Sequence, residues 1–198
     1  MKQIDFNIFN GVRPKVKLAK GSILIAEPFL QGPYFSRSIV FLTEYGKDGS
    51  VGFVLNKSSD VYPDEVIEDL FNFKGELFIG GPVASNTLHF LHTLGNKIPG
   101  SVKVTENIYW GGDFQRIKDL INIGKADEKS VKFFAGYSGW SPGQLESEIA
   151  ENSWIVLKVD DRSVMDNQID NFWTETLNGL GDDIYKTWSN FPTNPTFN

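Results

Sequence analysis

The sequence predicts an α+β fold built as a single domain. The β-rich runs "RSIVFLTEY" (37–45) and "SVGFVLNK" (50–57) follow one another across the loop "GKDG", which indicates an antiparallel hairpin. The helical patterns are grouped apart from the strands instead of alternating with them, as they would in a doubly wound parallel sheet. The chain also lacks the G-x-G-x-x-G and P-loop fingerprints of nucleotide-binding proteins.

Strands are predicted wherever a short apolar run is bounded by glycine, proline or polar residues. Ile39–Leu42 and Phe53–Leu55 are apolar without alternation, so the hairpin is expected near the centre of the sheet with both faces buried. The other predicted strands are "GSILIAEPF" (21–29), "ELFIGG" (76–81), "NTLHFLHT" (86–93), "SVKVTENIYWGG" (101–112), "VKFFAGY" (131–137) and "WIVLKV" (154–159).

Helices are predicted from amphipathic spacing and from signals at their ends. "DFQRIKDLINIG" (113–124) predicts a helix with Asp113 as its N-cap and Gly124 just past its end. "QIDNFWTETLNGLG" (168–181) predicts a final amphipathic helix, followed by a short segment around residues 184–188. "YPDEVIEDLFNF" (62–73) predicts a helix with Pro63 near its start and an inward stripe of Val66, Ile67, Leu70 and Phe71.

Composition excludes several classes of protein. The 198-residue chain has no cysteine, which excludes disulfides, thiol nucleophiles and cysteine-ligated zinc. Its formal net charge is -6, whereas nucleic-acid binding needs a concentrated basic surface, so direct DNA binding is not expected. The densest basic stretch, "RPKVKLAK" (13–20), is predicted to be a solvated lead-in.

The chain is divided into a lead-in (1–20), one α+β domain (21–190) and a C-terminal tail (191–198) that contains two prolines. The N-terminus has no unbroken apolar region of a secretory signal, and no apolar run approaches the ~20 residues of a membrane helix. We therefore expect a cytoplasmic protein that does not enter a membrane.

The stretch "GYSGWSPGQLESEI" (136–149) nearly contains the G-x-S-x-G turn that presents a nucleophilic serine. Trp140 occupies the position of the second glycine, and both histidines lie upstream of Ser138, so a nucleophile elbow is not expected. Ser141 to Gln144 have instead the S-x-x-Q form of a capping box, with proline at the first helical position. The loop is predicted to be a structural junction, and an anion at the helix N-terminus is left open.

His89 and His92 are the only imidazoles, and residues three apart on a strand face opposite sides, so they are not expected to chelate one metal. Pairing of Glu44 with Val51 across the hairpin would place Ser38 near Lys57 and Ile39 near Asn56. Such polar strand ends either cap the sheet or form a binding edge. The glycine turn "IGGPV" (79–83) is either a tight bend or a weak phosphate cradle.

Together, "LIAEPFL", "RSIVFLTE", "GSVGFVLNK", "IGGPV", "LHT" and "GYSGWSPGQLESEIAENSWI" resemble the AlgH/YqgE family of bacterial proteins, from about Gly21 to the tail. The resemblance implies a mixed, strongly bent β-sheet that approaches a pseudo-barrel, with helices packed around it. A transcriptional-regulator label is attached to this family. Many of its members carry a Cys-Glu-His triplet after the second strand, where this chain has Thr43-Glu44-Tyr45, so a thiolate mechanism is excluded here.

Two functions remain as hypotheses. The first is a regulatory or adaptor protein that acts through a protein partner, because no complete catalytic constellation is visible. The alternative is a small-molecule or anion-binding protein, with enzymatic activity left open, whose cleft lies near the glycine turns at 80–81 and 136–139. No metal, cofactor or catalytic residue is predicted. The candidate cleft residues are Arg37, Ser38, Glu44, Asn56, Gly80, Gly81, His92, Gly139, Trp140 and Gln144.

Overall fold

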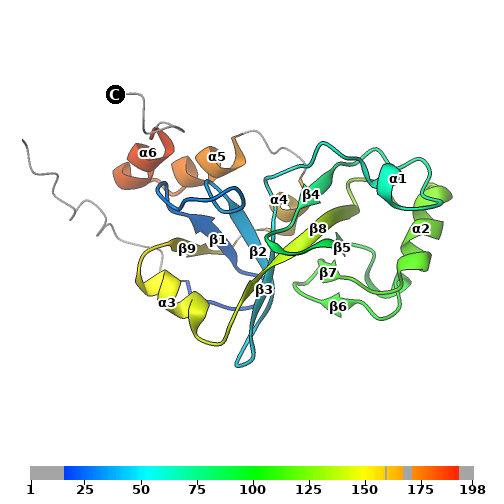
Figure 1. Ribbon diagram of the computed structural model, residues 1–198, viewed down its shortest axis with the longest axis horizontal. Coiled ribbons are helices and arrows are strands. Elements are labelled where there is room, and N and C mark those ends of the chain that lie inside the picture. Colours follow the sequence, from blue (N-terminus) through cyan, green and yellow to red (C-terminus); the bar gives the residue numbers. More distant parts are fainter. Residues whose placement is uncertain (1–15, 159, 167–170, 192–198) are drawn as a thin grey trace, which may run out of the picture.

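The computed structural model describes residues 16–158, 160–166 and 171–191, and it confirms the α+β class (Figure 1). Most of the predicted lead-in and tail, the end of the run 154–159 and the start of the pattern 168–181 lie outside these residues. The strands are β1 (Ile23–Ala26), β2 (Ile39–Gly46), β3 (Gly49–Val54), β4 (Leu77–Ile79), β5 (Val83–His92), β6 (Val102–Lys103), β7 (Tyr109–Trp110), β8 (Val131–Trp140) and β9 (Trp154–Leu157). The helices are α1 (Pro63–Val66), α2 (Phe114–Asn122), α3 (Gln144–Ala150), α4 (Asp161–Met165), α5 (Phe172–Gly179) and α6 (Asp183–Ser189).

The strands form one nine-stranded sheet in the order β6-β7-β5-β8-β3-β2-β1-β9, with β4 attached to β8. The sheet is not closed into a barrel. It is mixed because β4 runs parallel to β8, while the other paired strands are antiparallel.

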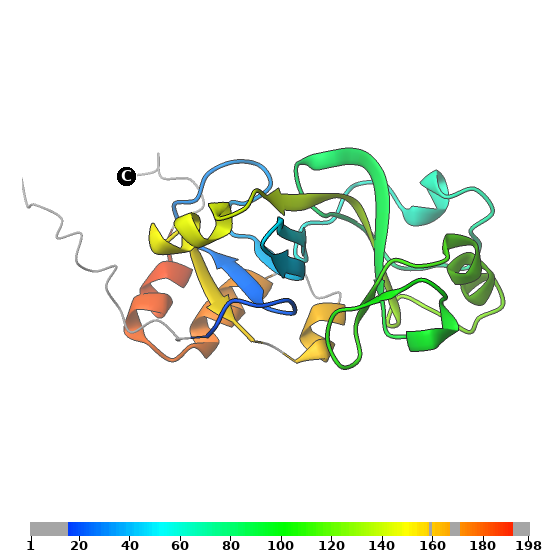
Figure 2. The same cartoon turned by 90° about the horizontal axis from the view of Figure 1, so that it is seen from below.

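Strand β8 joins the two halves of the sheet. Its first part, Val131–Tyr137, pairs with β5, and Phe133–Ala135 also pairs with β4. Its last part, Ser138–Trp140, pairs with β3. Figures 1 and 2 show β9, β1 and β2 on one side of this junction and β5, β6 and β7 on the other.

The hairpin of β2 and β3 lies near the centre of the sheet, and its apolar runs Ile39–Leu42 and Phe53–Leu55 are buried on both faces, as predicted, while its tip is exposed. Glu44 pairs with Val51, but a bulge between Leu42 and Glu44 shifts the register by one residue beyond it. Val40 therefore pairs with Val54, and the predicted neighbours Ser38–Lys57 and Ile39–Asn56 are each displaced by one position. The error arose because a bulge adds one residue to a single strand, which no local sequence signal marked.

Helices cover both faces of the half that contains β1 and β9 (Figure 2). Under α3, Trp140 and Trp154 pack with Leu145. On the opposite face, α4, α5 and α6 cover a larger core that includes Phe41, Phe53 and Phe134. A third core packs α2 and the loop after α1 against β5 and β8.

Helix α2 follows its predicted signals, since the Asp113 side chain accepts a hydrogen bond from the Arg116 N–H and Gly124 has a φ of 68°. The helix predicted over 62–73 is wrong beyond its first turn. Only α1 is helical there, and the chain continues as a loop with φ of 58° at Asp69 and 63° at Asn72. The loop still buries Ile67 and Leu70, but it leaves Val66 and Phe71 exposed.

Within the part of the chain that the structure describes, none of the helices has the length and apolar character needed to span a membrane.

Candidate functional site

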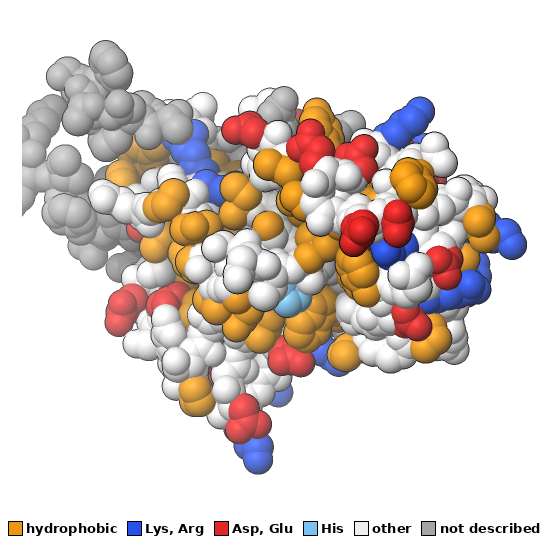
Figure 3. Space-filling model, turned by 45° about the vertical axis from the view of Figure 1, so that its right-hand side comes forward, with side chains coloured by type: hydrophobic (Ala, Val, Ile, Leu, Met, Phe, Trp, Pro, Cys, Tyr) orange, Lys and Arg blue, Asp and Glu red, His pale blue; other side chains and the backbone are white. Residues whose placement is uncertain are grey.

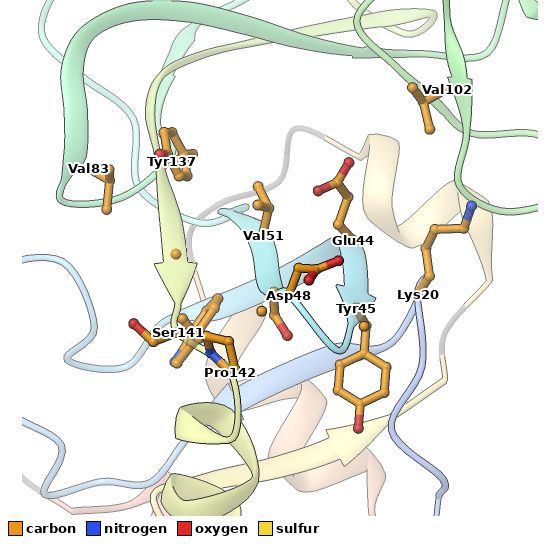
Figure 4. Close-up of a pocket in the computed structure, with 15 residues that line it drawn as sticks. Lys20, Glu44, Tyr45, Asp48, Val51, Val83, Val102, Tyr137, Ser141 and Pro142 are labelled. Carbon is orange, nitrogen blue, oxygen red and sulfur yellow. The ribbon is translucent and has the colours of Figure 1, made fainter.

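An open cleft of about 690 Å³ lies between the tip of the β2–β3 hairpin and the end of β8 (Figure 4). Its floor and walls come from segments that are far apart in the chain and that meet because β8 pairs with β3 on one side and β5 on the other. The lining residues are Lys20, Glu44, Tyr45, Gly46, Asp48, Gly49, Ser50, Val51, Val83, Val102, Tyr137, Gly139, Trp140, Ser141 and Pro142.

The hairpin supplies the negative charge of the cleft. Glu44 and Asp48 are exposed, and neither carboxylate has a hydrogen bond or ion pair with another described residue. Lys20 lines the opposite side, where its Nζ donates to the backbone oxygen of Lys103 at 2.8 Å. Figure 4 shows Glu44 between Val51 and Lys20. The hairpin side of the cleft is therefore acidic.

Next to Glu44, the Tyr45 hydroxyl donates a 2.7 Å hydrogen bond to Oε1 of Glu146 on α3. This hydrogen bond to a carboxylate is the main reason that the pKa of Tyr45 is raised, and partial burial and the charge of Glu146 add to it. Tyr45 thus remains a protonated donor that fixes the hairpin tip to α3.

Tyr137 connects the cleft to a group of aromatic side chains. Its ring contacts the ring of His89 with centroids 5.6 Å apart, and His89 also contacts Phe53 and Trp110. Nε2 of His89 lies 2.9 Å from Oγ1 of Thr87. Partial burial lowers the pKa of His89, which keeps the imidazole neutral at pH 7. His89, and not the candidate His92, is the histidine beside the cleft. The mixed polar and apolar residues of "NTLHFLHT" were the sequence feature that could have indicated a partly exposed His89.

His92 lies elsewhere, fully buried beneath the turn that precedes α2. Its Nδ1 accepts from the Leu94 N–H at 3.2 Å, so Nε2 carries the proton and can donate to the Gly111 carbonyl oxygen at 3.1 Å. Burial lowers the pKa of His92, and the bond to Gly111 opposes that shift. The ring also stacks on Tyr109, with centroids 5.6 Å apart, so its neighbours account for His92 without a ligand.

Arg37, Ser38 and Asn56 gather at the opposite end of the hairpin from the cleft. The Asn56 side chain accepts from the Ile39 N–H at 2.8 Å and donates to the Arg37 carbonyl oxygen at 2.9 Å. Arg37 donates to the carbonyl oxygen of Phe191, and its guanidinium lies 5.1 Å from the ring centroid of Trp173. Arg37 connects the start of β2 to the C-terminal helices, and the structure brings none of the three residues to the cleft.

The two glycine turns pack against each other beneath the cleft. A Cβ at Gly80 would lie 2.2 Å from the Gly136 carbonyl oxygen, and one at Gly81 would lie 2.4 Å from Oγ of Ser138. The Ser138 hydroxyl is fully buried and donates to the Gly80 carbonyl oxygen at 3.0 Å. Close backbone approach therefore explains these glycines, and Ser138 is a structural residue.

Gln144 and Trp140 belong to the junction between β8 and α3. Oε1 of Gln144 accepts from the Ser141 N–H at 3.0 Å, which is half of the predicted capping box. The other half is wrong, because the Gln144 N–H donates to the backbone oxygen of Ser141 and α3 begins only after Gly143. Oε2 of Glu148 accepts from the indoles of Trp140 and Trp154 at 2.9 and 2.8 Å. Hydrogen bonds within the junction therefore account for the polar groups of Trp140 and Gln144.

Thr43, at the position of the family cysteine, is fully buried in the β2 bulge, and its hydroxyl donates to the Val51 carbonyl oxygen at 3.3 Å. No acid–base group contacts it among the residues described. Nor do three or more histidine or carboxylate side chains gather there in a way that could hold a metal ion. Of the ten candidates, the cleft brings together Glu44, Gly139 and Trp140.

The chain matches the AlgH-like family over residues 23–185 and belongs to that family. It is 42% identical to a UPF0301 protein of Parabacteroides distasonis over 194 residues, which cover 97% of this chain and 98% of the relative. A UPF0301 protein of Bacteroides thetaiotaomicron is 39% identical, with 98% and 99% of the two chains covered.

Two solved structures share this fold. The solution structure of AlgH from Pseudomonas aeruginosa has a TM-score of 0.68 and 25% identity, covering 92% of this chain and 94% of that chain. A crystal structure of a Corynebacterium diphtheriae protein has a TM-score of 0.74 and 22% identity, covering 93% and 98%.

Proposed function

We propose that this member of the AlgH-like family is a regulatory or adaptor protein that acts through a protein partner. The observation that supports the proposal is an exposed apolar surface, the α1–α2 patch. It consists of Tyr62, Val66, Phe71 and Ile123, whose exposed fractions are 55%, 55%, 59% and 61%. Large apolar side chains that are grouped on a surface favour protein interaction, whereas isolated ones need no explanation.

The patch is held in place by α2. Asn122 accepts from the Phe71 N–H at 2.7 Å and donates to the Asp69 carbonyl oxygen at 2.8 Å, so the backbone of Phe71 is held at the C-terminal end of α2, which Ile123 follows. Val66 borders a shallow hollow of about 380 Å³ with Leu88 and Phe114. Figure 3, which brings this side of the molecule forward, shows apolar side chains next to both acidic and basic ones. A partner with an apolar surface and charged residues of both signs around it would complement this arrangement.

The test is affinity capture from the native cell with the wild-type chain and with the double variant Val66→Glu, Phe71→Glu. Both side chains are exposed, so the variant should remain folded while losing its partner. Phe29→Glu is the matched control, since Phe29 is 48% exposed at the other end of the molecule, against Phe191. The proposal fails if wild type, double variant and control capture the same proteins.

A second candidate function, small-molecule binding, is favoured by the cleft. Its volume of about 690 Å³ falls within the ~300–1,000 Å³ typical of ligand sites. A thermal-shift screen against metabolites tests this function, because a ligand at 100 times its Kd stabilises the fold by about 2.7 kcal/mol. Neither candidate requires catalysis, a metal or a cofactor. The cytoplasmic location and the boundaries at residues 20 and 190 stay predictions.

A further inference from the structure

The charged groups of the cleft differ in whether they have a hydrogen-bond or ion-pair partner. The carboxylates of Glu44 and Asp48 are exposed and have no partner among the described residues, whereas the Lys20 ammonium already donates to a carbonyl oxygen. A third carboxylate, that of Glu146, lies nearby and is held by Tyr45. Two carboxylates and one ammonium give this lining an excess of negative charge, which favours a cation over an anion.

The rest of the lining includes an apolar wall. Val51 is the cross-strand neighbour of Glu44, and Val83 and Tyr137 come from β5 and β8 and line the same space (Figure 4). Tyr137 is half-buried, and its contact with His89 holds its ring in place. A flat or aliphatic body could pack on this wall while a charged end reaches the hairpin, and an aromatic face also attracts a cation.

The backbone offers little to an anion. Gly139 and Trp140 are opposite Val51 and Ser50 in the β-ladder, and the Gln144 N–H donates to the Ser141 carbonyl oxygen. We propose that the cleft is a binding site for an organic cation, a guanidinium or ammonium group on an apolar or aromatic body. Glu44 and Asp48 bind the charged group, and Val51, Val83 and Tyr137 contact the body. This inference rests on the second candidate function and is independent of the α1–α2 patch.

The test compares three probes that share one ring and differ in charge: benzamidine (cation), benzamide (neutral) and benzoate (anion). Their affinities are measured by titration calorimetry. The methyl NMR signals of Val51 and Val83 report whether each probe occupies the cleft. Benzamidine is expected to shift both signals and to bind about tenfold more tightly than benzamide, because only its amidinium can form charge-assisted hydrogen bonds with the two carboxylates. Benzoate is expected to bind more weakly than either.

The double variant Glu44→Gln, Asp48→Asn is expected to weaken benzamidine binding about tenfold and to leave benzamide binding unchanged. Glu68→Gln, Glu175→Gln is the matched control, because it removes the same charge from exposed positions outside the cleft. Lys20→Met is expected to strengthen benzamidine binding by removing the one positive charge of the lining.

Butylguanidine and N-acetyl-arginine amide, which carry the same single charge, distinguish two sources of the cation. Tighter binding of butylguanidine assigns a free small molecule, and tighter binding of the amide assigns an arginine side chain of a polypeptide. The proposal is overturned if benzoate binds as tightly as benzamidine, if the methyl signals do not move, or if both charge variants weaken binding equally. The double variant Val66→Glu, Phe71→Glu alters only the α1–α2 patch and should bind benzamidine as wild type does. Failure of the adaptor proposal can therefore be distinguished from failure of the cation site.

Discussion

Lys132 is a lysine buried in the largest core. Its Nζ donates to the Asp166 carbonyl oxygen at 2.7 Å and to that of Val164 at 3.4 Å, and it lies 4.2 Å from the ring centroid of Phe78. Burial lowers the pKa of Lys132 to about 7, although the carboxylates of Asp166 and Glu76 oppose the shift. The lysine thus connects β8 to the end of α4 and remains partly neutral near pH 7.

This pKa makes stability depend on pH. The folded-state pKa is about 7 and the ordinary value is 10.5, so between these pH values the unfolded chain binds more protons, and the free energy of unfolding rises with pH. The contribution of Lys132 is at most ~1.4 kcal/mol per pH unit. In urea unfolding at pH 7, 8 and 9, the free energy of unfolding of the wild type should increase with pH relative to that of Lys132→Met. A difference that stays constant from pH 7 to 9 would contradict this pKa.

Thr43 allows a test of the position where many relatives carry cysteine. A thiol placed there by Thr43→Cys would be buried in the β2 bulge, so it should be protected from maleimide in the native protein and react only on unfolding. Asp48→Cys, at the exposed hairpin tip, is the control and should react within minutes. Rapid labelling of both would mean that the bulge opens in solution.

The histidines show how far single residues could be predicted. Strand periodicity predicted that His89 and His92 face opposite sides, because successive side chains alternate. Which of them would lie at a cleft depends on Tyr109 and Ser101 covering His92, and those contacts join segments that local patterns do not connect.

The turn between β4 and β5 crosses β8 so closely that only glycine fits. Gly80→Ala would place a Cβ 2.2 Å from the Gly136 carbonyl oxygen, and backbone cannot move away cheaply. We expect a loss of about 2 kcal/mol or more in the free energy of unfolding, measured in urea. Gly179→Ala is the matched control, since nothing lies within 4 Å of a Cβ there, and it should be neutral or stabilising by up to ~1 kcal/mol.

Elements with strong local signals were predicted well. Asp113 and Gly124 mark the ends of α2, and the apolar runs mark the central hairpin. The pattern from 62 to 73 failed because its apolar spacing fits a helix, while Asp69 and Asn72 turn the chain into a loop that packs on α2. Helix α4 was missed because it is one short turn capped by Asp160.

For the whole molecule, charge argues against direct DNA binding. The formal net charge is -6, and the densest basic stretch, residues 13–20, is short and was predicted to be a solvated lead-in. We expect the protein to pass through a heparin column at moderate salt and to leave a labelled duplex unshifted. Retention that falls steeply with added salt would contradict this expectation and would support a transcriptional regulator that binds DNA directly.

The overall class, α+β with a mixed sheet, was predictable from the strand runs and the family resemblance. The cleft was predicted only in part, through Glu44, Gly139 and Trp140, because the rest of its lining, such as Lys20 and Val102, joins them only after β8 has paired on both sides. Proximity of this kind depends on long-range pairing, which a single sequence does not display.

Shared use of β8 also affects how the chain folds as it leaves the ribosome. Strands β3, β4 and β5 are all made earlier, and each has an edge that pairs with β8. At a synthesis rate of ~5–20 residues per second, the edge of β3 waits on the order of ten seconds for its partner. Nascent chains of intermediate length therefore expose unpaired β-edges, which are templates for pairing with other chains.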